Sequence, residues 1–313
     1  ARRRDLTINA LFYEIQNNTI IDYDNGINDL EQGIIRIVGD PQKRFGRDPV
    51  RMMRAVRHSA RTGFTIEKET WNSIISNCDK LTLCPPSRVR DEVLKDFYSG
   101  ACAPWFRLAF DSGIFTTLFP LYKRVLKKGS LAPEVLQEQL DRIFQTIDRI
   151  DTLSKNQNIH RQPDFFLFAL MLTPWAESRF QLFSTFRKGA DLFQLAKKIR
   201  TELDQSIGIE FNLRRSLRQD IVSLLTSLSQ LIHHKKNNSW PAWLRKKSYF
   251  PKSSLFYRFY MEATTEAPIS SELLVPEELQ QQPSPTPSPI DHKELKTKTK
   301  PAFAVNTRGG VFG

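Results

Sequence analysis

The feature that most constrains the fold is a predicted arginine-rich helix between Phe45 and Arg61. Asp48 suits its N-cap and Pro49 its first turn, where a missing backbone N–H costs nothing. Apolar residues then recur at core-facing spacing, and arginines recur along another side. The apolar positions are Val50, Met53, Val56 and Ala60, and the arginines are Arg47, Arg51, Arg54 and Arg61, with Arg57 at the edge of their row. Because guanidinium groups suit phosphates and base edges, the pattern predicts a bound anion; the alternative is a solvated basic face.

The composition also favours an anionic partner. The chain has 313 residues, a formal net charge of +12 and a pI of about 9.7, which favours nucleic acid or an anionic membrane surface. No apolar run reaches the length of a membrane span. Cys78, Cys84 and Cys102 lack metal-ligand spacing, and there is no secretory signal. We therefore expect free thiols and a cytoplasmic location.

Residues 1–38 have β character. Alternation from Leu6 to Tyr13 predicts a strand, and further strands are predicted at residues 19–23 and 34–38. A short helix at residues 29–32 should end at Gly33. Three strands cannot bury a core alone, so we expect these residues to be the end of a larger α/β unit whose amino-terminal part is missing.

From residue 40 onward the hydrophobic period is helical, so we expect a mostly α fold. The predicted helices cover residues 65–78, 88–99, 104–112, 113–122, 132–155, 163–175, 176–205 and 214–234. The segment from Trp240 to Met261 is basic and aromatic, which suits either RNA stacking or a helix–helix core with lysines reaching solvent. After Ala263, proline-rich and lysine-rich sequence predicts a disordered basic tail.

A second cluster of polar residues lies at the start of the chain. The arginines of Arg2-Arg3-Arg4-Asp5 can grip a phosphate through charge-assisted hydrogen bonds. Asp5 can bind a metal or orient an arginine, and Asn9 falls on the same face of the predicted strand. The alternative is a frayed basic terminus.

Four motifs occur in order: Arg-Arg-Asp-x-Thr-Ile-Asn-Ala, Asp-Tyr-x-x-Gly-x-x-Asp-Leu, Ile-Arg-x-Val-Gly-Asp-Pro and Arg-Asp-Pro-Val-Arg-Met-Met-Arg-Ala-Val-Arg. In order and spacing they resemble the class II nucleotidyltransferases, the family of bacterial poly(A) polymerases and tRNA CCA-adding enzymes. The resemblance is specific across residues 2–64. Residues 166–171 and 209–221 look like the body of the poly(A) polymerase branch in particular.

The resemblance implies a domain order. Residues 1–39 would be the end of the nucleotidyltransferase head, 40–125 a helical neck that binds nucleobase and RNA, 126–262 a helical body, and 263–313 the tail. It implies template-independent transfer of AMP from ATP to RNA 3′ ends with Mg²⁺, in RNA polyadenylation and decay. The alternatives are a tRNA CCA- or A-adding enzyme and a catalytically inactive RNA-binding relative.

The resemblance also implies residue roles: a catalytic carboxylate, arginines that hold the triphosphate, and a pair that reads the base edge. By position, Asp5 is catalytic, Arg3 and Arg4 hold the triphosphate, Asn9 lies near the nucleotide, Asp48 and Arg51 read the base, and Arg54 and Arg57 line the same pocket. Arg88, Arg90 and Lys95 are candidate contacts to the RNA backbone, with a solvated face as the alternative.

The chain departs from the family pattern in three ways. Arg47 stands where the family usually has Glu, and His58 where it has an aromatic residue. The family's Gly-Gly loop and Asp-x-Asp metal pair would lie upstream of Arg2, so we expect no polymerisation by the chain as given. Asp22-Tyr23-Asp24 could mimic a metal pair, but the following Asn-Gly favours a turn.

Overall fold

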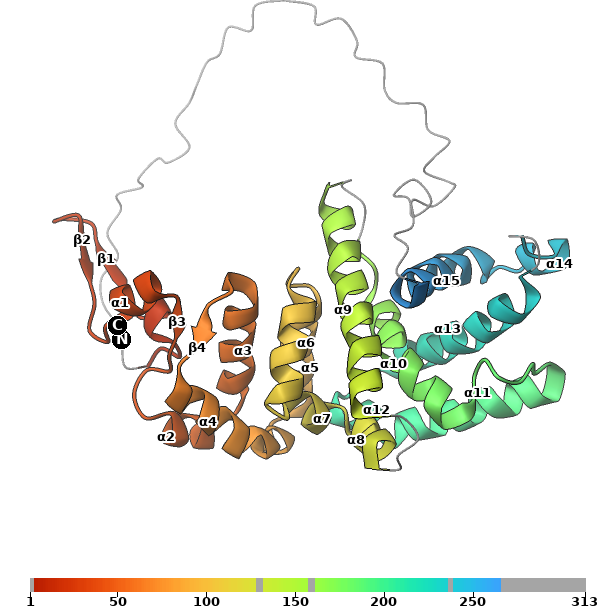
Figure 1. The fold of residues 1–313 in the computed structure, drawn as a ribbon, viewed down its shortest axis with the longest axis horizontal. Helices are drawn as coiled ribbons and strands as arrows, with labels where there is room; N and C mark the ends of the chain where they lie inside the picture. The colour runs from red at the N-terminus through yellow and green to blue at the C-terminus, as the bar shows by residue number, and fades with distance from the viewer. Residues whose placement is uncertain (1–2, 128–131, 157–160, 236–238, 266–313) are drawn as a thin grey trace, which may run out of the picture. The chain divides into compact units, whose positions relative to one another are not determined.

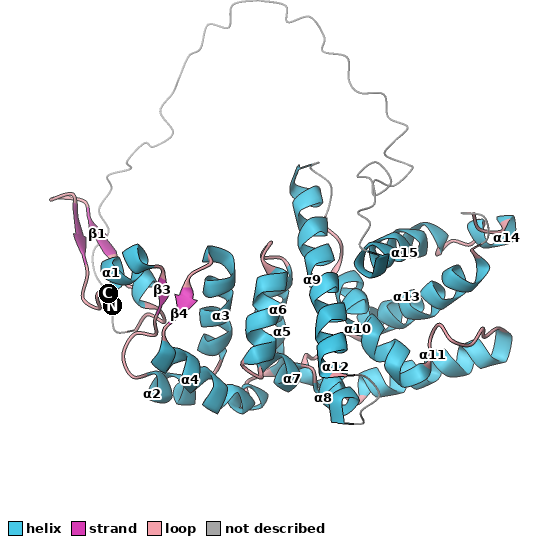
Figure 2. Ribbon diagram, viewed as in Figure 1, coloured by secondary structure: helices cyan, strands magenta, loops and turns pink. Residues whose placement is uncertain are grey.

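A computed structural model describes residues 3–127, 132–156, 161–235 and 239–265. These residues belong to one compact unit, and within it the strands lie in the amino-terminal part while helices make up the rest (Figures 1 and 2). The predicted mostly helical fold with a small α/β part is confirmed. None of the described helices combines the length and the apolar composition that crossing a membrane requires. Most of the predicted tail lies outside the described residues, although the last helix reaches Thr265.

The amino-terminal part contains two small sheets. Its elements are η1 (Thr7–Asn9), β1 (Phe12–Glu14), β2 (Thr19–Ile21), α1 (Gly26–Gln32), β3 (Ile34–Ile35) and β4 (Thr65–Ile66). β1 and β2 form an antiparallel hairpin with Tyr13 opposite Ile20, and β3 pairs with β4 in parallel. Gly33 ends α1 in the left-handed conformation, as predicted.

The strand predicted from Leu6 to Tyr13 is wrong in its first half. Only Leu6 bridges to Ile37, and the chain then turns as η1 against α1. The contact between these two helices is close: a β-carbon on Gly26 would lie 2.3 Å from the Thr7 carbonyl oxygen. Thr7 also donates its hydroxyl hydrogen bond to the buried Asp29 carboxylate at 2.7 Å. Packing on α1 therefore replaces the extended conformation that the alternating sequence favours.

The remaining elements are helical. They are α2 (Pro41–Arg47), α3 (Val50–Thr62), α4 (Lys68–Asn77), η2 (Cys78–Leu83), α5 (Pro86–Phe97), α6 (Cys102–Asp111), α7 (Ile114–Leu118), α8 (Pro120–Lys127), α9 (Pro133–Asn156), α10 (Asp164–Phe180), α11 (Gly189–Asp204), α12 (Ile207–Glu210), α13 (Arg215–His234), α14 (Ala242–Arg245) and α15 (Phe250–Thr265). Gly63 ends the arginine-rich helix α3 in the left-handed conformation, as predicted.

Two predicted helices are interrupted. The helix expected at residues 113–122 is two helices, because the chain restarts at Pro120. The helix expected at residues 176–205 is also broken: α10 ends at Gln181 in the left-handed conformation, and α11 begins at Gly189. The Glu177 carboxylate accepts a hydrogen bond from the backbone N–H of Phe183 at 2.7 Å, which holds the connecting turn.

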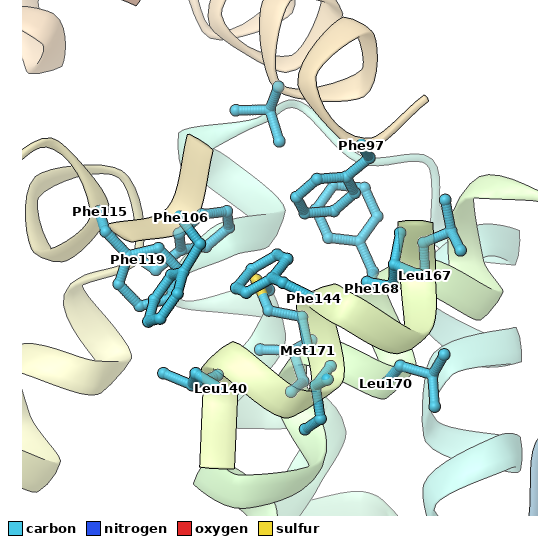
Figure 3. Close-up of a cluster of buried hydrophobic side chains, with 14 of the residues drawn as sticks. Phe97, Phe106, Phe115, Phe119, Leu140, Phe144, Leu167, Phe168, Leu170 and Met171 are labelled. Atoms are coloured by element: carbon cyan, nitrogen blue, oxygen red, sulfur yellow. The ribbon is translucent and has the colours of Figure 1, made fainter. Parts of the chain in front are cut away.

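The core is built largely from aromatic rings. α10 is buried on most sides from Phe166 to Ala176, as its apolar sequence predicts. Phe106 of α6 stacks on Phe144 of α9 with ring centroids 4.7 Å apart, and Phe97 of α5 lies in the same cluster (Figure 3). The carboxyl end of α5 is therefore anchored in the core that α6, α9 and α10 share.

Candidate functional site

The position of Asp5 is fixed by hydrogen bonds to the segment that follows β3. The Asp5 carbonyl accepts from the N–H of Val38 at 2.9 Å, and the N–H of Thr7 donates to the Arg36 carbonyl at 3.0 Å. Arg36 in turn contacts the Asp29 carboxylate at 3.0 Å and the Glu67 carboxylate at 2.5 Å. The start of the chain is thus tied to α1, β3 and the beginning of α4.

Asp22 supports this arrangement by holding the turn that leads into α1. Its carboxylate accepts hydrogen bonds from the backbone N–H groups of Asp24, Gly26 and Ile27 at 2.9–3.1 Å. The bond from Ile27 lowers the pKa of Asp22 most. The Asp-Tyr-x-x-Gly-x-x-Asp motif is therefore explained by structure: Asp22 holds the turn into α1, Gly26 permits close approach and Asp29 binds Thr7.

The side chain of Asp5 faces α3. Arg54 of α3 lies 3.3 Å from one carboxylate oxygen, and the N–H of Leu6 donates to the other at 3.0 Å. Burial opposes ionisation of Asp5, but the hydrogen bonds from Arg54 and Leu6 lower its pKa. Asp5 is therefore a partly buried carboxylate that stays charged near neutral pH.

The backbone of Arg4 is bound by two arginines from the neighbouring helices. The Arg4 carbonyl accepts a hydrogen bond from Arg44 of α2, and another from Arg51 of α3 at 3.2 Å. The side chains of Arg3 and Arg4 are exposed, and the Arg4 guanidinium lies 6.0 Å from the ring centre of Phe12. Both side chains remain accessible to an anion beside this corner.

Asp48 is not the N-cap that its sequence position predicts. Pro49 occupies the N-cap of α3, and Asp48 forms ion pairs with Arg51 at 3.3 Å and with Arg88 of α5 at 2.9 Å. The acid and the arginine predicted to act together are thus in contact. Arg51 connects Asp48 to the backbone of Arg4, so the two segments predicted to form one site lie together.

Asn9, the last residue of η1, lies close to His58 of α3. The Asn9 amide lies 3.5 Å from the His58 ring nitrogen Nε2. Burial lowers the pKa of His58; Asp5 opposes this shift, and Arg57, Arg61 and Arg54 add to it. His58 is therefore expected to be neutral at physiological pH, because burial and the neighbouring arginines both disfavour its protonated form.

Arg57 is held by two buried carboxylates. Its Nε lies 2.5 Å from Asp96, and a terminal nitrogen lies 2.6 Å from Glu92, both on α5. Another nitrogen donates to the Glu92 carbonyl at 2.9 Å. Arg54 also lies 3.6 Å from Glu92. The predicted nucleotide contact of Arg57 stays a prediction, because these interactions occupy its guanidinium in the structure.

An open cleft of about 640 Å³ adjoins the carboxyl-terminal half of α3. It lies between α3, α5 and the carboxyl end of α9. Its cationic lining residues are Arg57, Arg61, Lys95, Lys155 and Arg161, and His58 also lines it. Carboxylates behind the lining offset part of this charge, because Lys95 pairs with Glu92 and Lys155 with Asp151. Arg61, one of the lining residues, is exposed.

Comparison with known proteins supports the predicted relationship. The sequence matches the family described as "Poly A polymerase head domain" over residues 1–36 and the family described as "Probable RNA and SrmB-binding site of polymerase A" over residues 63–126. Poly(A) polymerase I of Escherichia coli O6:H1 is 36% identical over 171 residues, and that of Haemophilus influenzae is 42% identical over 120 residues. These matches confirm the predicted resemblance to the class II nucleotidyltransferases.

Relatives of both branches of the nucleotidyltransferase family are similar to the chain over part of their length. The match to the E. coli protein covers 55% of this chain and 35% of the relative, and the match to the Haemophilus protein covers 38% and 26%. A CCA-adding enzyme of Lactobacillus johnsonii is 41% identical over 113 residues, covering 36% of this chain and 28% of the relative. The matched stretches therefore span about a third of these curated nucleotidyltransferases or less.

A solved structure shows that the fold is shared. The Bacillus stearothermophilus CCA-adding enzyme in complex with CTP aligns with 89% of this chain and 57% of its own, at 21% identity and a TM-score of 0.58. The shared fold therefore extends beyond the region of clear sequence similarity.

Three residues of the candidate site were not predicted from the sequence. Glu92 and Asp96 fall on the same inward stripe of α5 as Val89 and Val93, and that position is a signal for buried partners of an arginine. Arg44 has no comparable signal, because its hydrogen bond goes to a backbone carbonyl forty positions away.

Proposed function

We propose that the whole protein transfers AMP from ATP to the 3′ ends of RNA without a template, as a poly(A) polymerase. The observation that carries the proposal is the position of Arg51, which contacts Asp48 and the backbone of Arg4. The pair proposed to read the base thereby lies beside Arg3 and Arg4, which are proposed to hold the triphosphate. The longer match to poly(A) polymerases than to the CCA-adding enzyme supports this branch of the family.

The chemistry of the pair suits adenine and cytosine. A carboxylate such as Asp48 only accepts hydrogen bonds, and a guanidinium such as Arg51 only donates them. Adenine and cytosine each present an amino donor beside a ring-nitrogen acceptor, whereas guanine and uracil present a carbonyl oxygen beside a ring N–H. The pair therefore favours ATP and CTP over GTP and UTP, and the choice between ATP and CTP must depend on other groups.

Magnesium is the metal this family reaction implies, since it aligns the 3′ hydroxyl and stabilises the leaving pyrophosphate. Mg²⁺ requires several oxygen ligands in octahedral geometry. Asp5 supplies one carboxylate, and no group of three or more metal-binding side chains occurs among the described residues. These residues do not make a magnesium site by themselves, so their proposed role is to bind and orient the nucleotide.

A nucleotide-incorporation assay separates the two enzyme branches. The polypeptide that carries this chain with a complete head domain is incubated with an mRNA-like 3′ end or with tRNA lacking CCA, and with ATP or CTP. We expect ATP to be added to the mRNA-like end. Addition of CTP to the tRNA would instead identify a CCA-adding enzyme, and no incorporation of either nucleotide would favour an inactive RNA-binding relative. The chain as given, assayed alone, is expected to incorporate neither.

Replacing Arg51 by alanine should relax the choice of nucleotide. Because a good bidentate base contact is worth roughly 1–3 kcal/mol of discrimination, preference for ATP over GTP and UTP should fall about 5- to 150-fold. The measurement is kcat/KM for each nucleotide in the same polypeptide. Arg61→Ala, an exposed arginine on the same helix, is the matched control and should keep the parental preference. An unchanged preference in Arg51→Ala would rule out the base-reading role.

A further inference from the structure

The basic and aromatic segment near the end of the described chain divides into buried and exposed rings. Phe256, Tyr257 and Phe259 of α15 are at most 5% exposed and belong to the core. Trp240 is fixed beside them, because its indole N–H donates to the Leu231 carbonyl at 3.0 Å and its ring packs edge-on against Tyr257. Packing in the core therefore accounts for the presence of these buried rings, but it does not account for the exposed rings nearby.

Three rings outside this core form a contiguous surface. Phe186, in the turn before α11, packs edge-on against His234 at the end of α13, with ring centroids 5.0 Å apart. His234 packs in the same way against Trp243 of α14 at 5.1 Å. Phe186 is 42% exposed and Trp243 is 51% exposed. We call these three residues the aromatic platform. Single exposed apolar residues are common on proteins, but rings gathered from three separate segments are not accounted for by folding.

The sequence around His234 and Trp243 is cationic. Residues 221–261 contain no Asp or Glu, and their lysines and arginines are Lys235, Lys236, Arg245, Lys246, Lys247, Lys252 and Arg258. Arg245, Lys246 and Lys247 begin two positions after Trp243 and are exposed, as is Lys188, two positions after Phe186. Lysine is depleted at the cores of protein–protein interfaces, so this composition does not favour a protein partner. Exposed rings within a field of positive charge are the combination that binds single-stranded nucleic acid.

We propose that the aromatic platform stacks bases of single-stranded RNA while the adjacent cations neutralise its phosphates. The site lies on the helical body and is separate from the contacts of α3 with Asp5. It would hold a part of the RNA strand away from the 3′ end that reacts. The inference shares with the proposed function only the premise that RNA is the partner.

The aromatic half of the proposal is tested by RNA binding without nucleotide. A fluorescent single-stranded oligonucleotide is titrated with the described chain, with Trp243→Ala and with Trp243→Phe. Stacking on an aromatic side chain is worth roughly 1–3 kcal/mol per base, so Trp243→Ala should bind at least about fivefold more weakly, while Trp243→Phe retains most of the affinity. Phe193→Ala, an exposed ring on α11, is the matched control and should bind as the parent does. The affinity for duplex RNA, whose bases are already stacked on one another, should not change in Trp243→Ala.

The cationic half is tested by salt dependence. Replacing Arg245, Lys246 and Lys247 by glutamine should reduce the slope of log affinity against log salt by about 2, since each phosphate contact on a single strand contributes roughly 0.7. In the matched control, Lys197 and Lys198, which are exposed on α11, are replaced by glutamine, and this variant should retain the parental slope. The proposal would be overturned if Trp243→Ala kept the parental affinity and the triple glutamine variant kept the parental salt slope. It would also be overturned if the parent chain did not bind RNA. Loss of nucleotide transfer with RNA binding intact would instead count against the proposed function alone.

Discussion

Replacing Arg57 by alanine is expected to destabilise the fold by about 3–5 kcal/mol, because removing one partner of a buried ion pair leaves the other charge uncompensated. Arg57 is 9% exposed, and its carboxylate partners Glu92 and Asp96 are 3% and 0% exposed. The arginine contacts them at 2.6 and 2.5 Å. The measurement is urea unfolding followed by circular dichroism, with extrapolation of the free energy of unfolding to water.

The cost of Arg57→Ala should increase with pH. Burial raises the pKa of Asp96 to about 7 against the pull of Arg57, while Arg57 and Lys95 outweigh burial and lower the pKa of Glu92. Without Arg57 the folded-state pKa of Asp96 rises further above that of the unfolded chain, and Glu92 loses one of the interactions that lower its pKa. The folded variant then binds more protons than the unfolded one, so its stability increases as pH falls from 8 to 5.

Arg61→Ala provides the control for this stability prediction. Arg61 lies one turn further along the same helix and is exposed, so its replacement should change stability by less than about 0.5 kcal/mol. Equal stability of Arg57→Ala and Arg61→Ala, or a destabilisation by Arg57→Ala that does not vary with pH, would show that the buried ion pairs contribute little.

Local sequence patterns predicted most of the helices but not the partners of charged residues. Gly33 and Gly63 end their helices because each can adopt a positive φ, which needs only local information. Asp48 has an equally good local signal for an N-cap, yet it pairs with Arg88, forty positions away. A local hydrogen bond predicted from spacing is replaced when a distant guanidinium reaches the same carboxylate.

Local sequence patterns were equally unable to predict which distant residues form the candidate site. Only the family resemblance predicts that Asp5 and Arg51 share a site, because composition and periodicity cannot pair segments separated by a chain reversal. The same patterns could not decide whether residues 240–261 were core or surface, and the structure shows that both descriptions hold for different rings. Trp240 packs inward and Trp243 stays half exposed, although only two residues separate them in the sequence.

The second large effect expected is loss of nucleotide transfer in Asp5→Asn. If Asp5 carries the catalytic role proposed for it, this variant of the polypeptide with a complete head domain should lose activity by about 100-fold or more, the loss typical when a charge-stabilising group is removed. Asparagine has the size of aspartate, and its amide oxygen can still accept from the Leu6 N–H, so the chain should still fold. The measurement is single-turnover incorporation of AMP into an RNA 3′ end, with urea unfolding as the test of folding.

Asp24→Asn is the matched control for Asp5→Asn, since it also removes one carboxylate charge near the start of the chain but lies in the turn before α1. It should keep activity within about twofold of the parent, because the carboxylate that holds this turn is that of Asp22. The lowered pKa of Asp5 predicts further that ionisation of this carboxyl does not limit the parental rate between pH 5 and 8. An Asp5→Asn variant as active as Asp24→Asn would mean that the carboxylate serves only to position Arg54, and the catalytic assignment would then be wrong.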